Sequence, residues 1–179
     1  LTAFARQMNI IDKTARFLAT DGFHEAVITE NDWVELKMKD VNEIEKTADY
    51  AILNTGSPHY IKWDNNVETT DVFSTGKLIR NSTPFRTNGI NVNFVQVHSS
   101  HLNVRTYERG VEAETLSCGT GVTAAAIASS NKESGQQEKR VVTPGGELKV
   151  KFFKISDTSF ANIWLCGPAK FVFSGIIEL

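Results

Sequence analysis

The stretch SCGTGVTAAAIAS, Ser117 to Ser129, decides the fold expected for this 179-residue chain. It places Cys118, one of only two cysteines, directly before Gly-Thr-Gly and a run of small apolar residues. From Gly121 onward almost no polar face remains, and a helix that is apolar all round is buried on every side. The sequence therefore predicts a central helix of small residues that carries a thiol at its N-terminus.

A thiol at a helix N-terminus lies beside unpaired backbone N–H groups and the positive end of the helix dipole. Both features favour the thiolate. Gly119 and Gly121 let an anion approach the backbone closely, and the Thr120 hydroxyl adds a donor. The motif indicates a reactive thiol beside a carboxylate or phosphate pocket. The alternative is a small residue packed at a tight loop–helix junction, as many buried cysteines are.

A charged pair precedes the thiol by about ten residues. Glu108 is the last residue of LNVRTYE, and Arg109 follows it; this stretch alternates between two kinds of side chain, as a strand with two different faces does. A guanidinium pairs with a carboxylate through two hydrogen bonds, and a carboxylate pairs with an ammonium group. The pair therefore suits an amino-acid ligand, whereas the alternative is a solvated strand end.

The rest of the chain reads as many short strands and few helices, which is the α+β class. Apolar residues spaced by three and four predict a helix from Leu1 to Leu18 that ends near Asp21. A second short helix is expected after Asp71, a favourable N-cap. Strands are predicted in HEAVIT, WVELKM, YAILN, PHYIKW, INVNFVQVHS, KRVVTP, ELKVKFFK, FANIWLCG and KFVFSGIIEL.

Composition excludes several classes of protein. Hydrophobic residues make up 41% and the net charge is -2, which argues against a nucleic-acid-binding surface. No apolar run approaches the roughly 18 residues that a membrane span needs. Cys118 and Cys166 are too few for a disulfide scaffold, which favours reduced thiols and a cytoplasmic protein, with a single disulfide as the alternative. The four histidines are scattered, so no metal site is expected.

The segment YERGVEAETLSCGTGVTAAAIAS, residues 107–129, resembles the second cysteine region of the diaminopimelate epimerase family. In that family Glu-Arg-Gly, a loop with Glu-Thr and Cys-Gly-(Thr/Ser)-Gly occur in this order. Three further segments resemble the family in the same order along the chain: NTGSPHYI (54–61), INVNFVQV (90–97) and GPAKFVFSGIIEL (167–179). The resemblance covers nearly the whole chain.

The resemblance implies an isomerase that uses no cofactor. It would convert LL-diaminopimelate to meso-diaminopimelate, in the biosynthesis of lysine and peptidoglycan precursors. One thiolate removes the α-proton, and a second thiol delivers a proton to the opposite face of the α-carbon. Two helix N-termini aimed at the α-carboxylate would stabilise the charge that develops there.

Catalytic roles carry over by position to three residues. Cys118 would be one of the two acid/base thiols, Glu108 would assist it and bind an ammonium group, and His59 would sit beside the other thiol. Roles in substrate binding are implied for Asn91, Glu108, Arg109, Gly119, Thr120 and Ser57.

Two departures from the family pattern concern these residues. Ser57 stands where the family has Asn, and serine has the shorter reach. The loop from Arg109 to Cys118 is one residue longer than the commonest family version. Of its two glutamates, Glu114 matches the family's Glu because Thr115 follows it.

The implied architecture is the diaminopimelate epimerase-like fold. Each of its two pseudo-symmetric lobes is a curved mixed or antiparallel sheet wrapped around a central helix. Residues 1–46 would be the remainder of the N-terminal lobe, 47–166 the C-terminal lobe, and 167–179 a strand that returns to the first lobe.

A second catalytic cysteine is missing from this sequence. The family carries it in Cys-Gly-Asn-Gly, which does not occur here, and Cys166 matches no catalytic position. We therefore expect a partial polypeptide, with the first lobe incomplete, inactive without the missing N-terminal segment of the same protein. Its other expected partners are a small amino-acid substrate and a second copy in a homodimer, with no nucleic acid and no membrane.

Two other functions compete with this hypothesis. One is another isomerase of the same fold, either proline racemase-like or phenazine-biosynthesis-like. Glu108 and Arg109 favour a substrate with a second amino-acid end, which proline lacks. The other is a non-catalytic module that holds a carboxylate in the pocket at the helix end.

Overall fold

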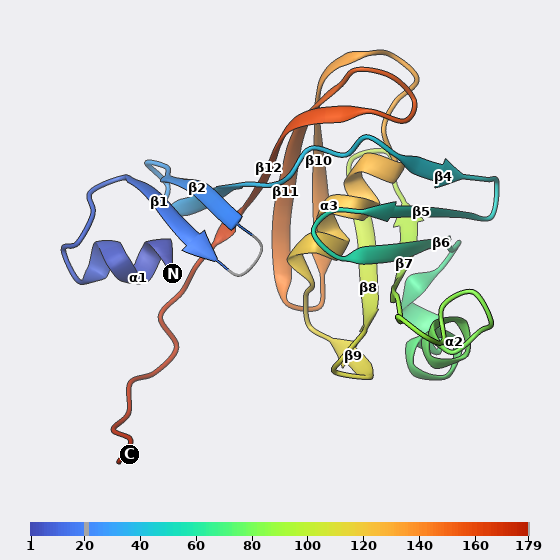
Figure 1. The fold of residues 1–179 in the computed structure, drawn as a ribbon, viewed down its shortest axis with the longest axis horizontal. Helices are drawn as coiled ribbons and strands as arrows, with labels where there is room; N and C mark the ends of the chain where they lie inside the picture. The colour runs from blue at the N-terminus through green and yellow to red at the C-terminus, as the bar shows by residue number, and fades with distance from the viewer. Residues whose placement is uncertain (20–21, 179) are drawn as a thin grey trace.

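The helix predicted from the opening stretch forms and lies at the centre of the molecule. The computed structural model describes residues 1–19 and 22–178, and in it α3 (Gly119–Ala128) is enclosed by strands (Figure 1). Every residue from Gly121 to Ala128 is buried. Because most of these side chains are methyl groups, strands can approach the helix closely on all sides.

The sheet around α3 is mixed and has twelve strands. Its order is β1-β2-β3-β12-β11-β10-β8-β7-β6-β5-β4, with β9 paired to β8. The pairs β6–β7 and β8–β10 are parallel, and the other neighbours are antiparallel. The strands are β1 (Thr14–Ala19), β2 (Gly22–Ile28), β3 (Trp33–Lys37), β4 (Ile44–Lys46), β5 (Tyr50–Asn54), β6 (Pro58–Trp63), β7 (Asn91–Val97), β8 (Leu102–Glu108), β9 (Ala113–Thr115), β10 (Gly135–Thr143), β11 (Gly146–Lys154) and β12 (Phe160–Pro168).

Because α3 touches strands from β5 through β8 and from β10 through β12, the sheet must curve around it. Apolar side chains of these strands and of α3 form the main core, which includes Ile61, Val104, Ile127 and Phe152. The predicted α+β class, a curved mixed sheet around a central helix, is confirmed.

A second, smaller core lies under α2 (Val72–Arg80), which packs on β7 and β8. The helix begins at Asp71, whose carboxylate accepts a hydrogen bond from the Ser74 N–H at 2.9 Å, as the sequence predicted. Gly76 allows the close approach, since a Cβ there would lie 2.4 Å from the Tyr107 Cβ. A short 3-10 helix, η1 (Val67–Thr69), precedes α2.

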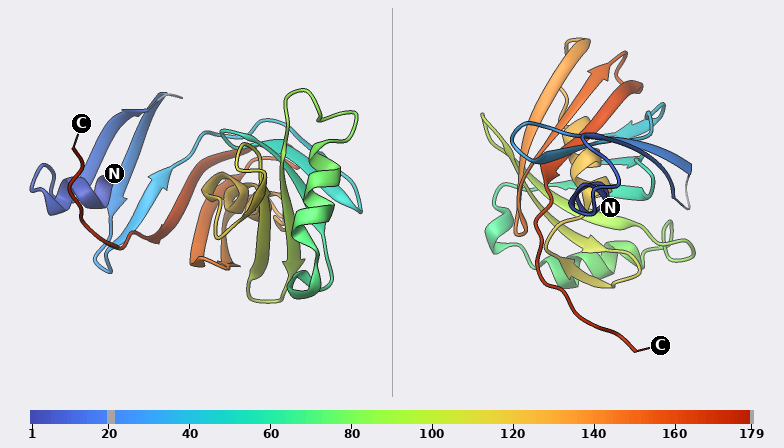
Figure 2. Two further views of the ribbon diagram at one scale, coloured as in Figure 1. Left: turned by 90° about the horizontal axis from the view of Figure 1, so that it is seen from below. Right: turned by 90° about the vertical axis from the view of Figure 1, so that its left-hand side faces the viewer.

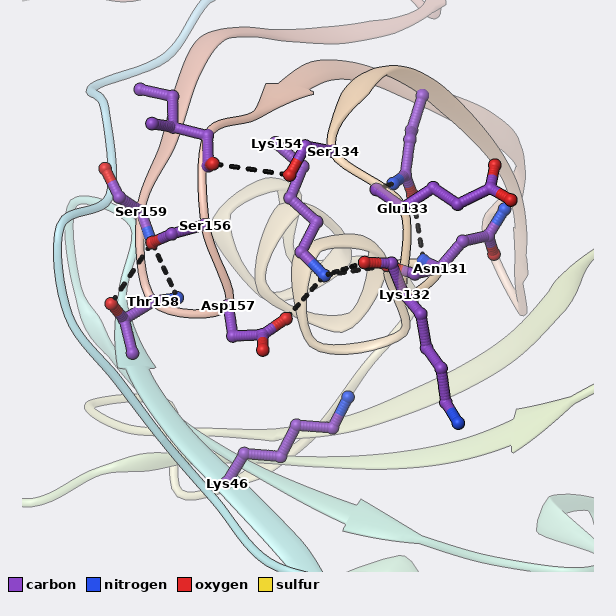
Figure 3. Close-up of polar contacts among 12 residues, drawn as sticks. Lys46, Asn131, Lys132, Glu133, Ser134, Lys154, Ser156, Asp157, Thr158 and Ser159 are labelled. Carbon is purple, nitrogen blue, oxygen red and sulfur yellow. Dashed lines mark hydrogen bonds and ion pairs between the residues drawn. The ribbon is translucent and has the colours of Figure 1, made fainter.

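Two lysines close the C-terminal end of α3 (Figure 3). The Lys46 ammonium donates to the Ala128 carbonyl at 2.7 Å. Lys154 is buried and donates to the carbonyls of Asn131 and Lys132, at 2.8 and 3.1 Å, and to Asp157 at 2.7 Å. These cations complement the negative end of the helix.

The two lysines and the loop that follows α3 line a cavity of about 350 Å³. The Lys46 ammonium points across it toward Lys154 and Asp157 (Figure 3). Burial, and next the charge of Lys154, lower the pKa of Lys46.

The N-terminal helix is much shorter than predicted, and the expectation of a helix through Leu18 is wrong. The helix α1 (Thr2–Gln7) is followed by β1, which pairs antiparallel with β2. Ala15, Phe17 and Ala19 are half-buried and alternate with exposed residues, which is the period of a strand. These residues form a strand although their apolar side chains have helical spacing, because β2 supplies backbone hydrogen-bond partners for them. The predicted helix end at Asp21 lies outside the described residues.

The segment α1–β1–β2 lies at one end of the molecule, away from α3 (Figure 2). Of the strand expected over 167–179, Gly167 and Pro168 belong to β12 and pair with β3, and residues 169–178 have no regular secondary structure. Leu179 lies outside the described residues. The division into lobes at residue 46 stays a prediction. No helix among the described residues is long and apolar enough to span a membrane.

Candidate functional site

Cys118 is the N-cap residue of α3, at the position that the sequence predicted. Its backbone is extended, and its carbonyl accepts the Val122 N–H at 2.8 Å. Its side chain makes no capping hydrogen bond. The first N–H groups of a helix have no partners within the helix, so they remain available beside the thiol.

Three side chains meet directly in front of this helix end. His59 Nε2 lies 3.0 Å from Ser57 Oγ and 2.9 Å from Thr120 Oγ1, and the two hydroxyl oxygens lie 3.1 Å apart. Thr120 Oγ1 also lies 3.5 Å from Cys118 Sγ. Four of the predicted site residues, from β6, the turn before it and α3, are therefore joined by hydrogen bonds.

The other nitrogen of His59 is held by residues of the sheet. Asn93 Nδ2 lies 3.0 Å from His59 Nδ1, and Thr106 Oγ1 donates to Asn93 Oδ1 at 2.9 Å. All three residues are buried. Gly121 permits this arrangement, because a Cβ there would lie 2.3 Å from Asn93 Oδ1.

Sequence reasoning did not assign roles to Asn93 or Thr106. The available signal was the repeat of Asn in INVNF, since residues two apart on a strand share a face. Asn93 therefore shares a face with Asn91, and Thr106 is its cross-strand partner in the β7–β8 pair. This pairing could not be read from the sequence, because the register of two strands depends on the turn between them.

Asn91 connects Ser57 to the Glu-Arg-Gly segment. Its Nδ2 donates to Ser57 Oγ at 3.2 Å and to the Pro58 carbonyl at 3.0 Å, and its Oδ1 accepts the Arg109 N–H at 2.9 Å. The Arg109 guanidinium donates to the Asn88 carbonyl at 2.9 Å. Asn91 and Arg109 therefore lie beside the cluster, with the Arg109 side chain directed to the loop before β7.

Glu108 is held next to the segment that leads to Cys118. Thr115 Oγ1 donates to Glu108 Oε2 at 2.8 Å, and Cys118 is not among the hydrogen-bond partners described for this carboxylate. The loop glutamates point elsewhere, since Glu112 pairs with Arg80 and Glu114 with Arg105.

Electrostatics keep His59 neutral. Burial, and next the nearby Arg109 cation, lower the pKa of His59 to about 3. A neutral imidazole has one N–H and one acceptor nitrogen, so it makes two hydrogen bonds of opposite sense.

Cys166 is separated from Cys118 by the sheet. Leu165 faces α3, because a Cβ on Gly119 would lie 2.9 Å from its Cδ2, and successive residues of a strand point to opposite faces. Cys166 therefore lies on the other face of β12, beside Glu35 of β3. Both cysteines are free, and burial raises the pKa of Cys166 to about 11. Over residues 1–19 and 22–178, no group of His, Cys, Asp and Glu side chains is placed to hold a metal ion.

Comparison with known sequences relates residues 51–172 to the diaminopimelate epimerase family. The diaminopimelate epimerase of Flavobacterium psychrophilum is 46% identical over 99% of this chain and 70% of its own length. That of Chlorobaculum tepidum is 37% identical over 93% of this chain and 66% of its own length. This chain thus spans about two thirds of each of these two relatives.

Comparison with solved structures supports the fold. A probable proline racemase from Agrobacterium radiobacter matches 98% of this chain and 65% of its own, with a TM-score of 0.70 and 13% identity. A phenazine biosynthesis protein from Bacillus anthracis matches 93% of this chain and 69% of its own, with a TM-score of 0.66 and 13% identity. At such low identity these similarities show a shared architecture alone.

Proposed function

Since this chain belongs to the diaminopimelate epimerase family, which is a family of isomerases, we propose that Cys118 is one of two acid/base groups in a cofactor-independent epimerisation. The reaction converts LL-diaminopimelate to meso-diaminopimelate, a precursor of lysine and peptidoglycan. The observation that carries this proposal is the position of Cys118 at the open N-terminus of α3, in contact with Thr120.

The chemistry follows from what this helix end offers. The Cys118 thiolate takes the proton from the α-carbon, and the electron pair of the C–H bond moves toward the α-carboxylate. The N–H groups of Gly119 and Thr120 stabilise the negative charge that develops on the carboxylate oxygens. An acid on the opposite face then returns a proton to the α-carbon, which inverts it with no net oxidation or reduction.

Substrate contacts are proposed for the residues around this cluster. Ser57 and Asn91 present short polar side chains next to Thr120, and the Arg109 cation lies close enough to His59 to influence it. Glu108 accepts the Thr115 hydroxyl with one oxygen. We propose that its other oxygen binds an ammonium group of the substrate and that Arg109 binds the distal carboxylate.

The second acid/base group is not Cys166, because that thiol lies on the other face of β12 and its raised pKa keeps it protonated. Inversion needs a donor on each face of the α-carbon. We therefore propose that residues 1–179 alone do not turn over diaminopimelate.

Proton exchange at the α-carbon in heavy water tests these assignments in the intact epimerase that contains this sequence. Replacing Cys118 by Ala is expected to slow exchange into LL- and meso-diaminopimelate by roughly 10²- to 10⁴-fold. The matched control is Cys166→Ala, which removes the other thiol and is expected to keep exchange. Exchange retained in Cys118→Ala would remove the proposed role.

Alkylation separates an enzyme from a module that only holds a carboxylate. If Cys118 is catalytic, iodoacetamide should modify it in preference to Cys166, and diaminopimelate should protect it. Proline serves as the control ligand, because it lacks the second amino-acid end that Glu108 and Arg109 would bind. A Cys118 that is inert in the folded protein contradicts the enzyme assignment.

A further inference from the structure

We propose that Asn93 and Thr106 are positioning residues: they hold His59 in the tautomer whose proton is on Nε2, and thereby direct the Thr120 hydroxyl proton toward Cys118 Sγ. This inference rests on the proposed function of Cys118 as a thiolate base. It concerns four hydrogen bonds that lead from strand β8 through β7 and β6 to the start of α3.

The orientation of the Asn93 amide is the first step. Its Nδ2 lies 3.4 Å from the Tyr60 carbonyl, which can only accept, and its Oδ1 accepts the Thr106 hydroxyl proton at 2.9 Å. The atom that faces His59 Nδ1 at 3.0 Å is therefore the NH₂ group. Because Asn93 is completely buried, no water competes for these contacts.

The tautomer of His59 follows from that orientation. An NH₂ group donates, so His59 Nδ1 accepts and carries no proton. In a neutral imidazole the single proton must then be on Nε2, which faces Thr120 Oγ1 at 2.9 Å and Ser57 Oγ at 3.0 Å. His59 is itself completely buried.

The direction of the Thr120 hydroxyl is the last step. The His59 Nε2 proton faces Thr120 Oγ1 at 2.9 Å and Ser57 Oγ at 3.0 Å, and we assign it to Thr120 because Ser57 Oγ already accepts from Asn91 Nδ2. The Thr120 proton is then free to point at Ser57 Oγ or at Cys118 Sγ. Ser57 Oγ already accepts a proton from Asn91 Nδ2 at 3.2 Å. A charged acceptor forms the stronger bond, so the Thr120 proton turns to the sulfur when Cys118 is a thiolate.

All donors in this chain then point the same way, from Thr106 to Asn93, His59, Thr120 and finally Cys118. Aligned hydrogen bonds strengthen one another in a buried site. With the other tautomer, Nε2 would be an acceptor and would draw the Thr120 proton away from the sulfur. The buried amide of Asn93 thus stabilises the thiolate without touching it.

Two measurements on the folded protein test this proposal without turnover. Nitrogen NMR of labelled histidine should show His59 with the proton on Nε2. The variant Asn93→Leu removes the hydrogen-bond donor to His59 Nδ1, so the NMR signals of His59 should show a mixture of the two tautomers. Alkylation of Cys118 near neutral pH should slow by about tenfold in this variant. Thr106→Val should have a smaller effect in the same direction.

The matched control is Thr123→Val. Thr123 is buried in the same helix, but its hydroxyl donates to the Gly119 carbonyl and not to the chain. Thr123→Val should therefore leave both the tautomer of His59 and the alkylation rate of Cys118 unchanged.

A wild-type His59 with its proton on Nδ1 would overturn the proposal, even if Asn93→Leu fails to fold. So would a folded Asn93→Leu variant with an unchanged alkylation rate. If both measurements agree but Cys118→Ala keeps proton exchange, the proposed function fails and the positioning role stands.

Discussion

At its N-terminal end α3 begins at Cys118, whose thiol makes no capping hydrogen bond, and its first backbone N–H groups have no partner within the helix. A cluster of neutral hydrogen bonds around His59 lies beside this end. At its C-terminal end, Lys46 donates to the Ala128 carbonyl. Lys154 donates to the carbonyls of Asn131 and Lys132 (Figure 3). Both ends belong to one buried helix, but side-chain charges close the second end, whereas the first remains open.

We interpret the N-terminal end of α3 as the end that binds a ligand and its C-terminal end as the end that stabilises the fold. An anion that binds at a helix N-terminus must find unpaired donors, so a capping side chain there would compete with it. At the other end the Lys154 ammonium holds the carbonyls of Asn131 and Lys132 in the loop that leads to β10, and the Lys46 ammonium binds the carbonyl of Ala128, the last residue of α3. The two ammonium groups thus stabilise the C-terminal end of α3, whereas the cluster of neutral side chains surrounds the end at which we propose that substrate binds.

The largest expected effect on stability is at the N-terminal end, from Gly121→Ala. Its Cβ would lie 2.3 Å from Asn93 Oδ1 and 3.3 Å from His59 Cε1, and both residues are fully buried, so we expect a loss of about 3 kcal/mol in the free energy of unfolding. Chemical denaturation measures this loss. Gly175→Ala is the control, because a Cβ there meets no atom within 4 Å. Equal stability of the two variants would show that a Cβ at position 121 is accommodated beside Asn93 without cost.

A smaller loss, about 2 kcal/mol, is expected at the C-terminal end from Lys154→Met, since the carbonyls of Asn131 and Lys132 lose their buried donor. The alkylation rate of Cys118 should not change, because the substitution affects the other end of α3. Lys149→Met, which removes a partly exposed ion pair with Glu138, is the matched control and should cost well under 1 kcal/mol. A changed alkylation rate in Lys154→Met would mean that the two ends are coupled.

The effect that is smallest near neutral pH, and that grows as the pH falls, is a dependence of stability on pH that originates at His59. The pKa of His59 in the folded protein is about 3, below the ordinary value of 6.5. Between pH 3 and pH 6.5, the imidazole of His59 therefore takes up a proton only in the unfolded chain. Stability should therefore fall as pH falls through this window, by about 1.4 kcal/mol per pH unit, and should show no His59 contribution above about pH 6.5. Denaturation of the protein and of His59→Gln at several pH values isolates this slope as their difference. Parallel curves would contradict a buried neutral His59.

Much of the site could be predicted from the sequence because its motifs are local. Cys118 lies at the helix end because a short motif specifies both the small-residue helix and its first residue. The hydrogen bonds that Ser57 and His59 make to Thr120 could not be predicted by spacing, since Thr120 lies more than 60 residues further along the chain. Roles for Asn93 and Thr106 could not be predicted because their pairing depends on the register of β7 and β8.

The N-terminal region shows where local patterns fail. Leu1 to Leu18 has the spacing of an amphipathic helix, but the residues from Thr14 to Ala19 form β1 because β2 supplies backbone partners for them. A short apolar pattern can fit both the period of a helix and the period of a strand. Here the pairing with β2 decides in favour of the strand.

The sequence by itself determined that a buried helix of small residues forms and that a thiol stands at its N-terminus, because both depend on residues close together in the chain. The tertiary structure alone decided the tautomer of His59, the separation of Cys166 from Cys118 by the sheet, and the closure of the far end of α3 by Lys46 and Lys154. These features arise where strand register and sheet curvature bring distant residues within hydrogen-bond distance, and no local pattern encodes such a distance.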